Sequence, residues 1–226
     1  MLDFDRFTTL TFDCYGTLIN WERGAALTLR SLLSGHGVDA GEAEVIDLFH
    51  RIQSRERVRG YRPYTEILAD TVFGIATHYG CRLEPGEMHA LSGSVGAWRP
   101  FPDTVRALQA FKTRYRIGVI SNIDDDLFAG TAERLQVRFD AVVTAEQARA
   151  YKPAEAIFRL ALERLGCAAA EVLHVGQWVE GDVIPAKRLG MGTVWVARSR
   201  GSRDSGDEAD VQVPDLDALV KLVGIE

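Results

Sequence analysis

A lone carboxylate stands where an apolar run gives way to a glycine turn. Residues 7–12 read Phe-Thr-Thr-Leu-Thr-Phe, Asp13 follows them, and Gly16 comes soon after. A parallel strand buried on both faces reads as a near-continuous apolar run, and ligands in open α/β sheets bind beyond the carboxyl ends of such strands. Asp13 is therefore placed as a nucleophile would be, although a turn or a helix N-cap also favours aspartate there.

A second polar pair ends another predicted strand. Ser121 and Asn122 follow residues 116–120, Arg-Ile-Gly-Val-Ile, and their hydroxyl and amide could donate hydrogen bonds to a carboxylate held beside Asp13. Taken alone, a Ser-Asn pair after a strand is most often a turn or an N-cap. Its interpretation therefore depends on the elements around it.

Short apolar strands alternate with helical segments in the second half of the chain. This alternation predicts an α/β fold with a Rossmann-like parallel sheet core and helices on both faces. The polar, glycine-containing run 198–210 is expected to be an exposed loop. The predicted strands are residues 7–12, 116–120, 139–143, 172–175 and 192–196, and helical spacing marks 43–52, 64–79, 156–165 and 183–189.

The segment 19–98 has a different texture, with helical patterns throughout and no convincing strand. Pro100 and Pro102 then make a stiff return linker. We therefore expect a catalytic core of residues 1–18 and 99–226, into which a helical cap of residues 19–98 is inserted after the first strand.

Composition sets the class of protein. The 226 residues are 46% apolar and carry a formal charge of -6 without a long basic run, which suits a globular protein and argues against nucleic acid as a partner. The three cysteines are too few and too scattered for a disulfide framework or a zinc site. With no signal-peptide pattern at the amino terminus and no apolar stretch near the ~20 residues of a membrane span, we expect a cytoplasmic location.

The segment 12–18, Phe-Asp-Cys-Tyr-Gly-Thr-Leu, resembles the first motif of the haloacid dehalogenase superfamily, and its Asp-x-Tyr form is similar to the 2-haloacid dehalogenase branch. In the superfamily's phosphatases, the resemblance implies, an Asp-x-Asp pair supplies a nucleophile and an acid while magnesium screens the phosphate. A halide leaves as a stable anion and needs no proton, so Tyr15 suits carbon–halogen cleavage. The backbone N–H groups of Cys14 and Tyr15 are candidates for holding a substrate carboxylate or an oxyanion.

Two further motifs follow in the order and spacing of the superfamily. Ser121 and Asn122 match its second motif, and Lys152, followed by proline, resembles its third. An ammonium near Asp13 would keep that carboxylate ionised and neutralise negative charge in a transition state, although a lone Lys-Pro pair is usually a solvated lysine before a helix. One departure is Phe158, where the family often has tyrosine, so the site loses one hydroxyl.

The fourth motif reads Val-Gly-Gln-Trp-Val-Glu-Gly-Asp over residues 175–182. Gln177 stands where the family's phosphatases have a magnesium-binding aspartate, and a neutral amide is a poor ligand for that ion. Asp182 is expected to orient Lys152 or to position the hydrolytic water, with Glu180 as a nearby rival. Gln177 and Trp178 are assigned to substrate binding, and no metal is expected.

The dehalogenases use a cap arginine near the substrate carboxylate and the departing halide. Arg51, in the helical segment 43–52, is our choice for this role. A charged, solvated helix face is the plainer explanation of the surrounding basic residues. A shifted alignment would promote one of the neighbours Arg55, Arg57, Arg59 and Arg62.

The motifs together predict a metal-independent hydrolase that displaces halide from a 2-haloacid through an ester of Asp13 and gives a 2-hydroxy acid. A phosphatase acting on a small phosphorylated metabolite and a carbon–nitrogen ring-opening hydrolase of the same branch are the alternatives. The joint presence of Asp13, Lys152 and Asp182 argues against a non-catalytic binding protein. The expected partner is a small carboxylate, not a membrane or nucleic acid, and a homodimer is left open.

Overall fold

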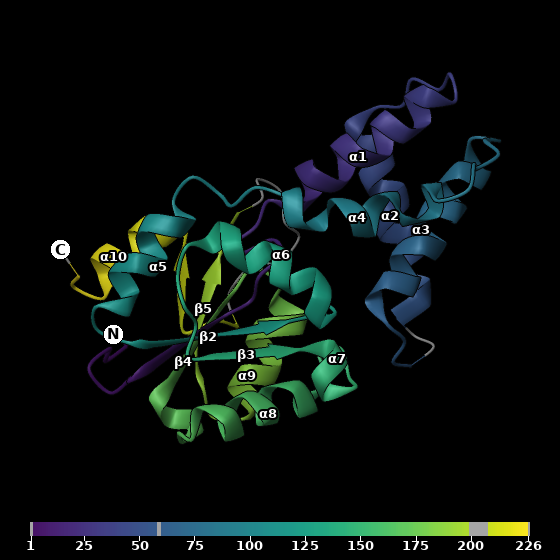
Figure 1. Ribbon diagram of the computed structural model, residues 1–226. Coiled ribbons are helices and arrows are strands. Elements are labelled where there is room, and N and C mark those ends of the chain that lie inside the picture. The colour runs from purple at the N-terminus through teal and green to yellow at the C-terminus, as the bar shows by residue number, and fades with distance from the viewer. Residues whose placement is uncertain (1, 58–59, 199–207, 226) are drawn as a thin grey trace. The chain divides into compact units, whose positions relative to one another are not determined.

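A computed structural model describes residues 2–57, 60–198 and 208–225. The chain divides into two compact units (Figure 1). We call them the sheet unit, Met1–Ile19, Pro100–Asn122 and Leu135–Glu226, and the helical unit, Asn20–Arg99 and Ile123–Arg134.

The sheet unit contains one sheet, in which the described residues form six strands in the order β3-β2-β1-β4-β5-β6, every neighbouring pair being parallel (Figure 1). The predicted α/β class with a parallel sheet is therefore confirmed. The strands are β1 (Thr9–Phe12), β2 (Arg116–Ser121), β3 (Ala141–Thr144), β4 (Val172–Gly176), β5 (Gly192–Val196) and β6 (Val211–Val213).

Strand β1 lies at the centre of the sheet, between β2 and β4, and all four of its residues are buried. Its two threonines are tolerated there because each hydroxyl has a partner: Thr9 meets Thr8, and Thr11 meets His174 of β4 at 2.9 Å. Asp13 follows directly, so the chain delivers it to the carboxyl edge of the sheet.

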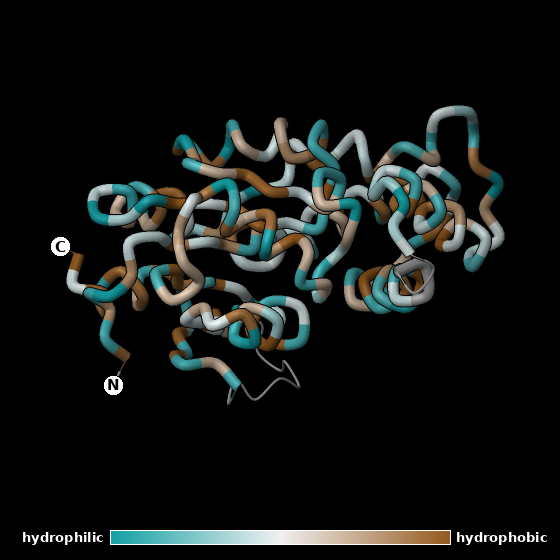
Figure 2. The backbone as a smooth tube through the Cα atoms, turned by 90° about the horizontal axis from the view of Figure 1, so that it is seen from below, coloured by the Kyte–Doolittle hydropathy of each residue, from teal (hydrophilic) through white to brown (hydrophobic). Residues whose placement is uncertain are grey.

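Helices cover both faces of this sheet. Figure 1 shows α5 (Thr104–Lys112) and α10 (Leu216–Leu222) together on one face, and α8 (Glu155–Leu165) and α9 (Ile184–Arg188) on the other. Hydrophobic and hydrophilic residues alternate along the helices (Figure 2). Helix α8 is typical, because Ile157, Phe158, Ala161 and Leu165 are buried while the residues between them are more exposed. The short α7 (Ala145–Ala148) follows β3.

The helical unit is built from α1 (Trp21–Gly35), α2 (Glu42–Arg57), α3 (Tyr64–His78), α4 (Ala90–Ser94) and most of α6 (Asp125–Leu135). Asp124 explains why the segment before α6 belongs here. Its carboxylate accepts hydrogen bonds from the backbone N–H groups of Tyr64 and Thr65 at 2.8 and 2.7 Å. Asp124 thus caps α3, because Pro63 at the N-cap position makes no side-chain hydrogen bond. Within the described residues, no helix has the length and hydropathy needed to span a membrane.

The expected elements lie close to the observed ones, with particular differences. The strands predicted at 7–12 and 139–143 begin two residues later, at Thr9 and Ala141. Sequence patterns did not predict β6, which is only three residues long. They also placed residues 123–134 with the core, whereas these residues pack with the helical unit. Of the predicted loop 198–210, residues 199–207 lie outside the described residues.

Candidate active site

The carboxyl edge of the sheet gathers three charged side chains. Asp13 follows β1, Lys152 lies in the connection between α7 and α8, and Asp182 belongs to a π-helical turn, Val179–Val183, after β4. Lys152 Nζ lies 2.6 Å from Asp13 Oδ1 and 2.6 Å from Asp182 Oδ1. Their side chains are only 10%, 1% and 1% exposed for Asp13, Lys152 and Asp182. The structure thus brings three predicted catalytic residues into one buried network.

A glycine allows Asp182 to approach the sheet. A Cβ at Gly176, the last residue of β4, would lie 2.5 Å from Asp182 Cβ, which is closer than real side chains come. The backbone N–H of Trp178 donates to Asp182 Oδ2 at 3.2 Å. The rival carboxylate Glu180 is exposed. Of the two carboxylates, Asp182 is therefore the one that is buried against Lys152.

Burial and charge act in opposite directions on these groups. Burial, with Asp182 nearby, raises the pKa of Asp13 even though Lys152 and Thr17 favour its ionised form. Burial also disfavours ionised Asp182, but the charge of Lys152 and the side chain of His174 outweigh it and lower the pKa of Asp182. Burial opposes the charge of Lys152, whose pKa the two carboxylates nevertheless raise. The charged forms of Asp182 and Lys152 are therefore favoured, whereas Asp13 is the carboxylate that is protonated more easily.

Thr17 holds the second carboxylate oxygen of Asp13. Its hydroxyl donates to Asp13 Oδ2 at 2.8 Å and accepts the backbone N–H of Gln177 at 3.0 Å. Gly16, at φ +105°, permits this turn, and a Cβ there would lie 2.6 Å from Gln177 Nε2. The Gln177 side chain therefore lies over the backbone of the turn that follows Asp13.

The predicted Ser-Asn pair separates into two roles. Ser121 is fully buried at the end of β2, and its Oγ has no hydrogen-bond partner among the described residues. Asn122 Oδ1 instead accepts the backbone N–H of Lys152 at 2.7 Å, and its Nδ2 donates to the Lys152 carbonyl at 3.4 Å. Asn122, predicted to bind substrate, thus holds the backbone of Lys152, while Ser121 keeps a hydroxyl to offer.

Three other predicted substrate-binding residues lie near this network in the sequence and take different environments. Cys14 is fully buried, and burial raises the pKa of its thiol well above the usual value, which disfavours the reactive thiolate form. Tyr15 and Trp178 are half-buried. The Trp178 ring packs on Gly181, where any Cβ would overlap it.

The predicted arginine lies in the helical unit. Arg51 is exposed on α2, and its carbonyl accepts the hydroxyl of Ser54 at 3.0 Å. Of its rivals, Arg62 is paired with Asp70 at 2.9 Å and with Glu66 at 3.3 Å. Arg55 and Arg57 are described by their backbone in α2, and Arg59 lies outside the described residues.

The donor set does not fit magnesium. Magnesium prefers several hard anionic oxygens in octahedral array, whereas an ammonium already binds one oxygen each of Asp13 and Asp182, and Tyr15 and Gln177 are neutral. Within the described residues, no group of three or more His, Cys, Asp or Glu side chains is arranged to hold a metal ion.

The sequence analysis missed two supports of the turn that follows Asp13. One is the hydroxyl of Thr17 itself. The other is Arg198, which donates to the Thr17 carbonyl at 2.9 and 3.1 Å, pairs with both oxygens of Asp103 at 2.8 Å and stacks on Phe101 at 4.3 Å. Arg198 lies two residues after the end of β5, so its place near the carboxyl end of a predicted strand was the available signal.

A third missed residue is His174, which lies in the middle of β4. It is the polar residue of an otherwise apolar strand, and this was the available signal.

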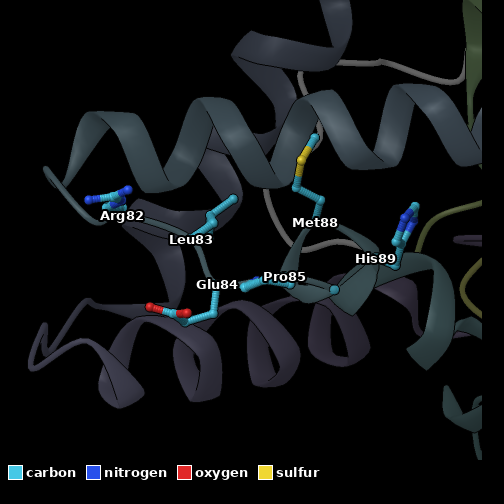
Figure 3. A pocket seen from close by; sticks show the side chains of 7 residues that line it. Arg82, Leu83, Glu84, Pro85, Met88 and His89 are labelled. Carbon is cyan, nitrogen blue, oxygen red and sulfur yellow. The ribbon is translucent and has the colours of Figure 1, made fainter.

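A surface pocket in the helical unit is separate from these predicted residues. Figure 3 shows its lining, which comes from the segment between α3 and α4: Arg82, Leu83, Glu84, Pro85, Gly86, Met88 and His89. The lining contains no residue of the Asp13 network, so this pocket is not the candidate active site.

Comparisons with known proteins agree on the family. The haloacid dehalogenase-like hydrolase family matches residues 7–190. A glyceraldehyde 3-phosphate phosphatase of Methanothermobacter thermautotrophicus is 30% identical, over 93% of this chain and 96% of that protein. Haloacetate dehalogenase H-2 of Moraxella sp. (strain B) is also 30% identical, over 97% of this chain and 99% of that protein.

Among solved structures, the L-2-haloacid dehalogenase of Xanthobacter autotrophicus with chloropropionic acid covalently bound has the same fold. Its TM-score is 0.83 at 21% identity, and the match covers 96% of this chain and 98% of that one. The relatives therefore include both dehalogenases and phosphatases at similar identity.

Proposed function

The chain belongs to the haloacid dehalogenase-like hydrolases, and from this membership we propose that it displaces halide from a 2-haloacid, without a metal ion, to give a 2-hydroxy acid. The observation that carries the proposal is the Lys152 ammonium, bonded at 2.6 Å to both Asp13 and Asp182. The ammonium supplies positive charge beside Asp13. Tyr15 and Gln177, which stand where the family's phosphatases have carboxylates, are neutral.

In the first step, a carboxylate oxygen of Asp13 attacks C2 of the haloacid from the side opposite the halogen. The new C–O bond forms as the carbon–halogen bond breaks, and the bonding pair leaves with the halide. No proton is transferred in this step, which suits Tyr15 at the position where an acid would otherwise stand. Lys152 favours the ionised, reactive form of Asp13, and Thr17 fixes its second oxygen.

In the second step, water attacks the Asp13 carbonyl carbon of the ester. The C–O bond between that carbon and the oxygen on C2 breaks, one water proton ends on the product hydroxyl, the other is released to solvent, and Asp13 returns as a carboxylate. Lys152, held by Asp182, stabilises the oxyanion that forms on Asp13. The buried, unpartnered hydroxyl of Ser121 is assigned to the substrate carboxylate.

We assign Arg51 of the helical unit to recognition of the substrate carboxylate or the departing halide. The role of the helical unit as a cap, a cytoplasmic location and a homodimer likewise stay predictions from the sequence.

A phosphatase is the second candidate, favoured by the 30% identity to a glyceraldehyde 3-phosphate phosphatase over 93% of the chain. Phosphoryl transfer in this family would need a magnesium site, and the neutral side chains of Tyr15 and Gln177 do not supply anionic oxygen ligands for one. The residues of the site therefore favour the dehalogenase.

A substrate panel tests the proposal. Purified protein is assayed for halide release from 2-haloacids and for phosphate release from p-nitrophenyl phosphate and glyceraldehyde 3-phosphate, with magnesium and with chelator. We expect halide release that survives chelation. Magnesium-dependent phosphate release with no halide from any haloacid would show that the chain is a phosphatase.

A further inference from the structure

A buried histidine lies against the charged network without a role in the reaction given above. Nδ1 of His174 lies 2.9 Å from the hydroxyl of Thr11, and its ring meets Phe158 edge-on at a centroid distance of 5.2 Å. Nε2 has no hydrogen-bond partner among the described residues, and the polar atom that faces it is Asp182 Oδ1, at 3.5 Å. The ring is therefore fixed on two sides, and its remaining nitrogen faces a carboxylate.

The two neutral tautomers of His174 present different atoms to Asp182. With the proton on Nε2, an N–H dipole points at the carboxylate, whereas with the proton on Nδ1 a lone pair faces it. Thr11 accommodates either tautomer, because its hydroxyl can donate or accept. The charge on Asp182, which Lys152 sustains, therefore selects the tautomer with the proton on Nε2.

This choice affects the nucleophile through a shared cation. The ammonium of Lys152 lies equally close to Asp13 and Asp182. A second donor that satisfies part of the charge on Asp182 leaves more of the ammonium's attraction for Asp13.

We propose that His174 is a positioning residue, which donates from Nε2 to Asp182 and thereby keeps Lys152 directed at Asp13. His174 touches neither substrate nor reacting atoms and passes no proton. The proposal rests on the proposed function only in taking Asp13 as the nucleophile.

Two matched substitutions separate this role from packing. The amide nitrogen of glutamine reaches about as far as Nε2, so His174→Gln retains a donor toward Asp182. The shorter His174→Asn retains a partner for Thr11 but loses that donor. The groups that face His174 are Thr11 of β1, Phe158 of α8 and Asp182, with Lys152 beyond.

The kcat/KM pH profile of the three proteins is the first measurement. We expect His174→Asn to lower kcat/KM about tenfold at neutral pH and to move the acid limb to higher pH, because Asp13 loses part of the cation that keeps it ionised. His174→Gln should stay within about threefold of the wild type, with its acid limb unmoved. Equal profiles for the two variants, both normal or both impaired, would overturn the proposal.

The tautomer of the wild-type protein is the second measurement, and it needs no variant and no turnover. Nitrogen-15 NMR of the imidazole should show His174 protonated on Nε2, and protonation on Nδ1 alone would refute the assignment. The pH profiles are measured with whichever haloacid or phosphorylated compound of the substrate panel the protein turns over. A failure of halide release therefore contradicts the proposed function, whereas a wrong tautomer contradicts only the role of His174.

Discussion

The charges at the carboxyl edge of the sheet and those of the helical unit are held in opposite ways. Lys152 and Asp182 have side chains 1% exposed and contact each other at 2.6 Å, whereas Arg62 and Glu66 of the helical unit are 30% and 56% exposed and lie 3.3 Å apart. A buried charge without a partner is costly, but an exposed pair contributes little because water can replace either partner. Changes in the first region should therefore affect both activity and stability strongly.

The largest expected effect on activity is that of Asp13→Asn. An amide is a far weaker nucleophile than a carboxylate, so turnover should fall by about a thousandfold or more. Halide release, measured after mass spectrometry has excluded deamidation, checks this. Activity of more than a few per cent would mean that another group attacks the substrate.

The same variant should be more stable than the wild type at neutral pH. Burial raises the pKa of Asp13 in the folded state, so folding favours its protonated form and its ionised form costs stability as the pH rises through the folded-state pKa. Asparagine removes this cost, and the gain should vanish in acid, where Asp13 is protonated in both states. Denaturant unfolding at neutral and acidic pH would contradict this account if Asp13→Asn were less stable at neutral pH.

A loss of stability is expected for Lys152→Met, which leaves two buried carboxylates without their cation. The free energy of unfolding should fall by about 3–5 kcal/mol. Lys187→Met is the matched control, since Lys187 is 46% exposed in its pair with Asp210 and should cost under about 1 kcal/mol. Chemical denaturation of both variants at neutral pH measures the contrast, and equal losses would show that burial does not distinguish the two lysines.

A smaller effect is expected in the helical unit. Arg51→Ala should lower kcat/KM by a factor that corresponds to about 2 kcal/mol of transition-state stabilisation, because it removes a charge-assisted contact with the substrate carboxylate or the departing halide. Arg62→Ala is the control, because Arg62 already pairs with Asp70 and Glu66, and it should change kcat/KM by less than about threefold. An unchanged kcat/KM for Arg51→Ala beside a large loss for Arg55→Ala would move the role along the helix.

The sequence predicts well which residues lie at the carboxyl edge of the sheet, because the parallel topology places them there. Parallel strands bring their carboxyl ends to one edge, so Asp13 after β1 and Ser121 at the end of β2 were predicted to lie there from local patterns. What the patterns could not give is hydrogen-bond direction. Asn122 turns to the backbone of Lys152 rather than remaining open for substrate, because that backbone needs a partner where it passes the sheet edge.

The position of Arg51 was less predictable, because Arg51 lies on a helix and not at the end of a parallel strand. In a helical sequence pattern, an arginine that binds substrate also cannot be told from one that is merely solvated. The assignment of residues 123–134 to this unit depends on Asp124, whose carboxylate caps α3 across a long gap in sequence. His174 was missed because a single histidine in a strand carries no spacing signal, and only the fold places Thr11 and Asp182 on either side of its ring.

The most direct test of the central claim is a single turnover in heavy-oxygen water with enzyme in excess over haloacid. If Asp13 attacks carbon and water then opens the ester at its carbonyl, the first product carries an oxygen that began on Asp13, and the label enters that carboxylate. Mass spectrometry of the peptide containing Asp13 should therefore find the label in the protein and none in the product hydroxyl. A labelled product beside an unlabelled Asp13 would mean that Asp13 activates water as a general base, and would contradict the covalent mechanism.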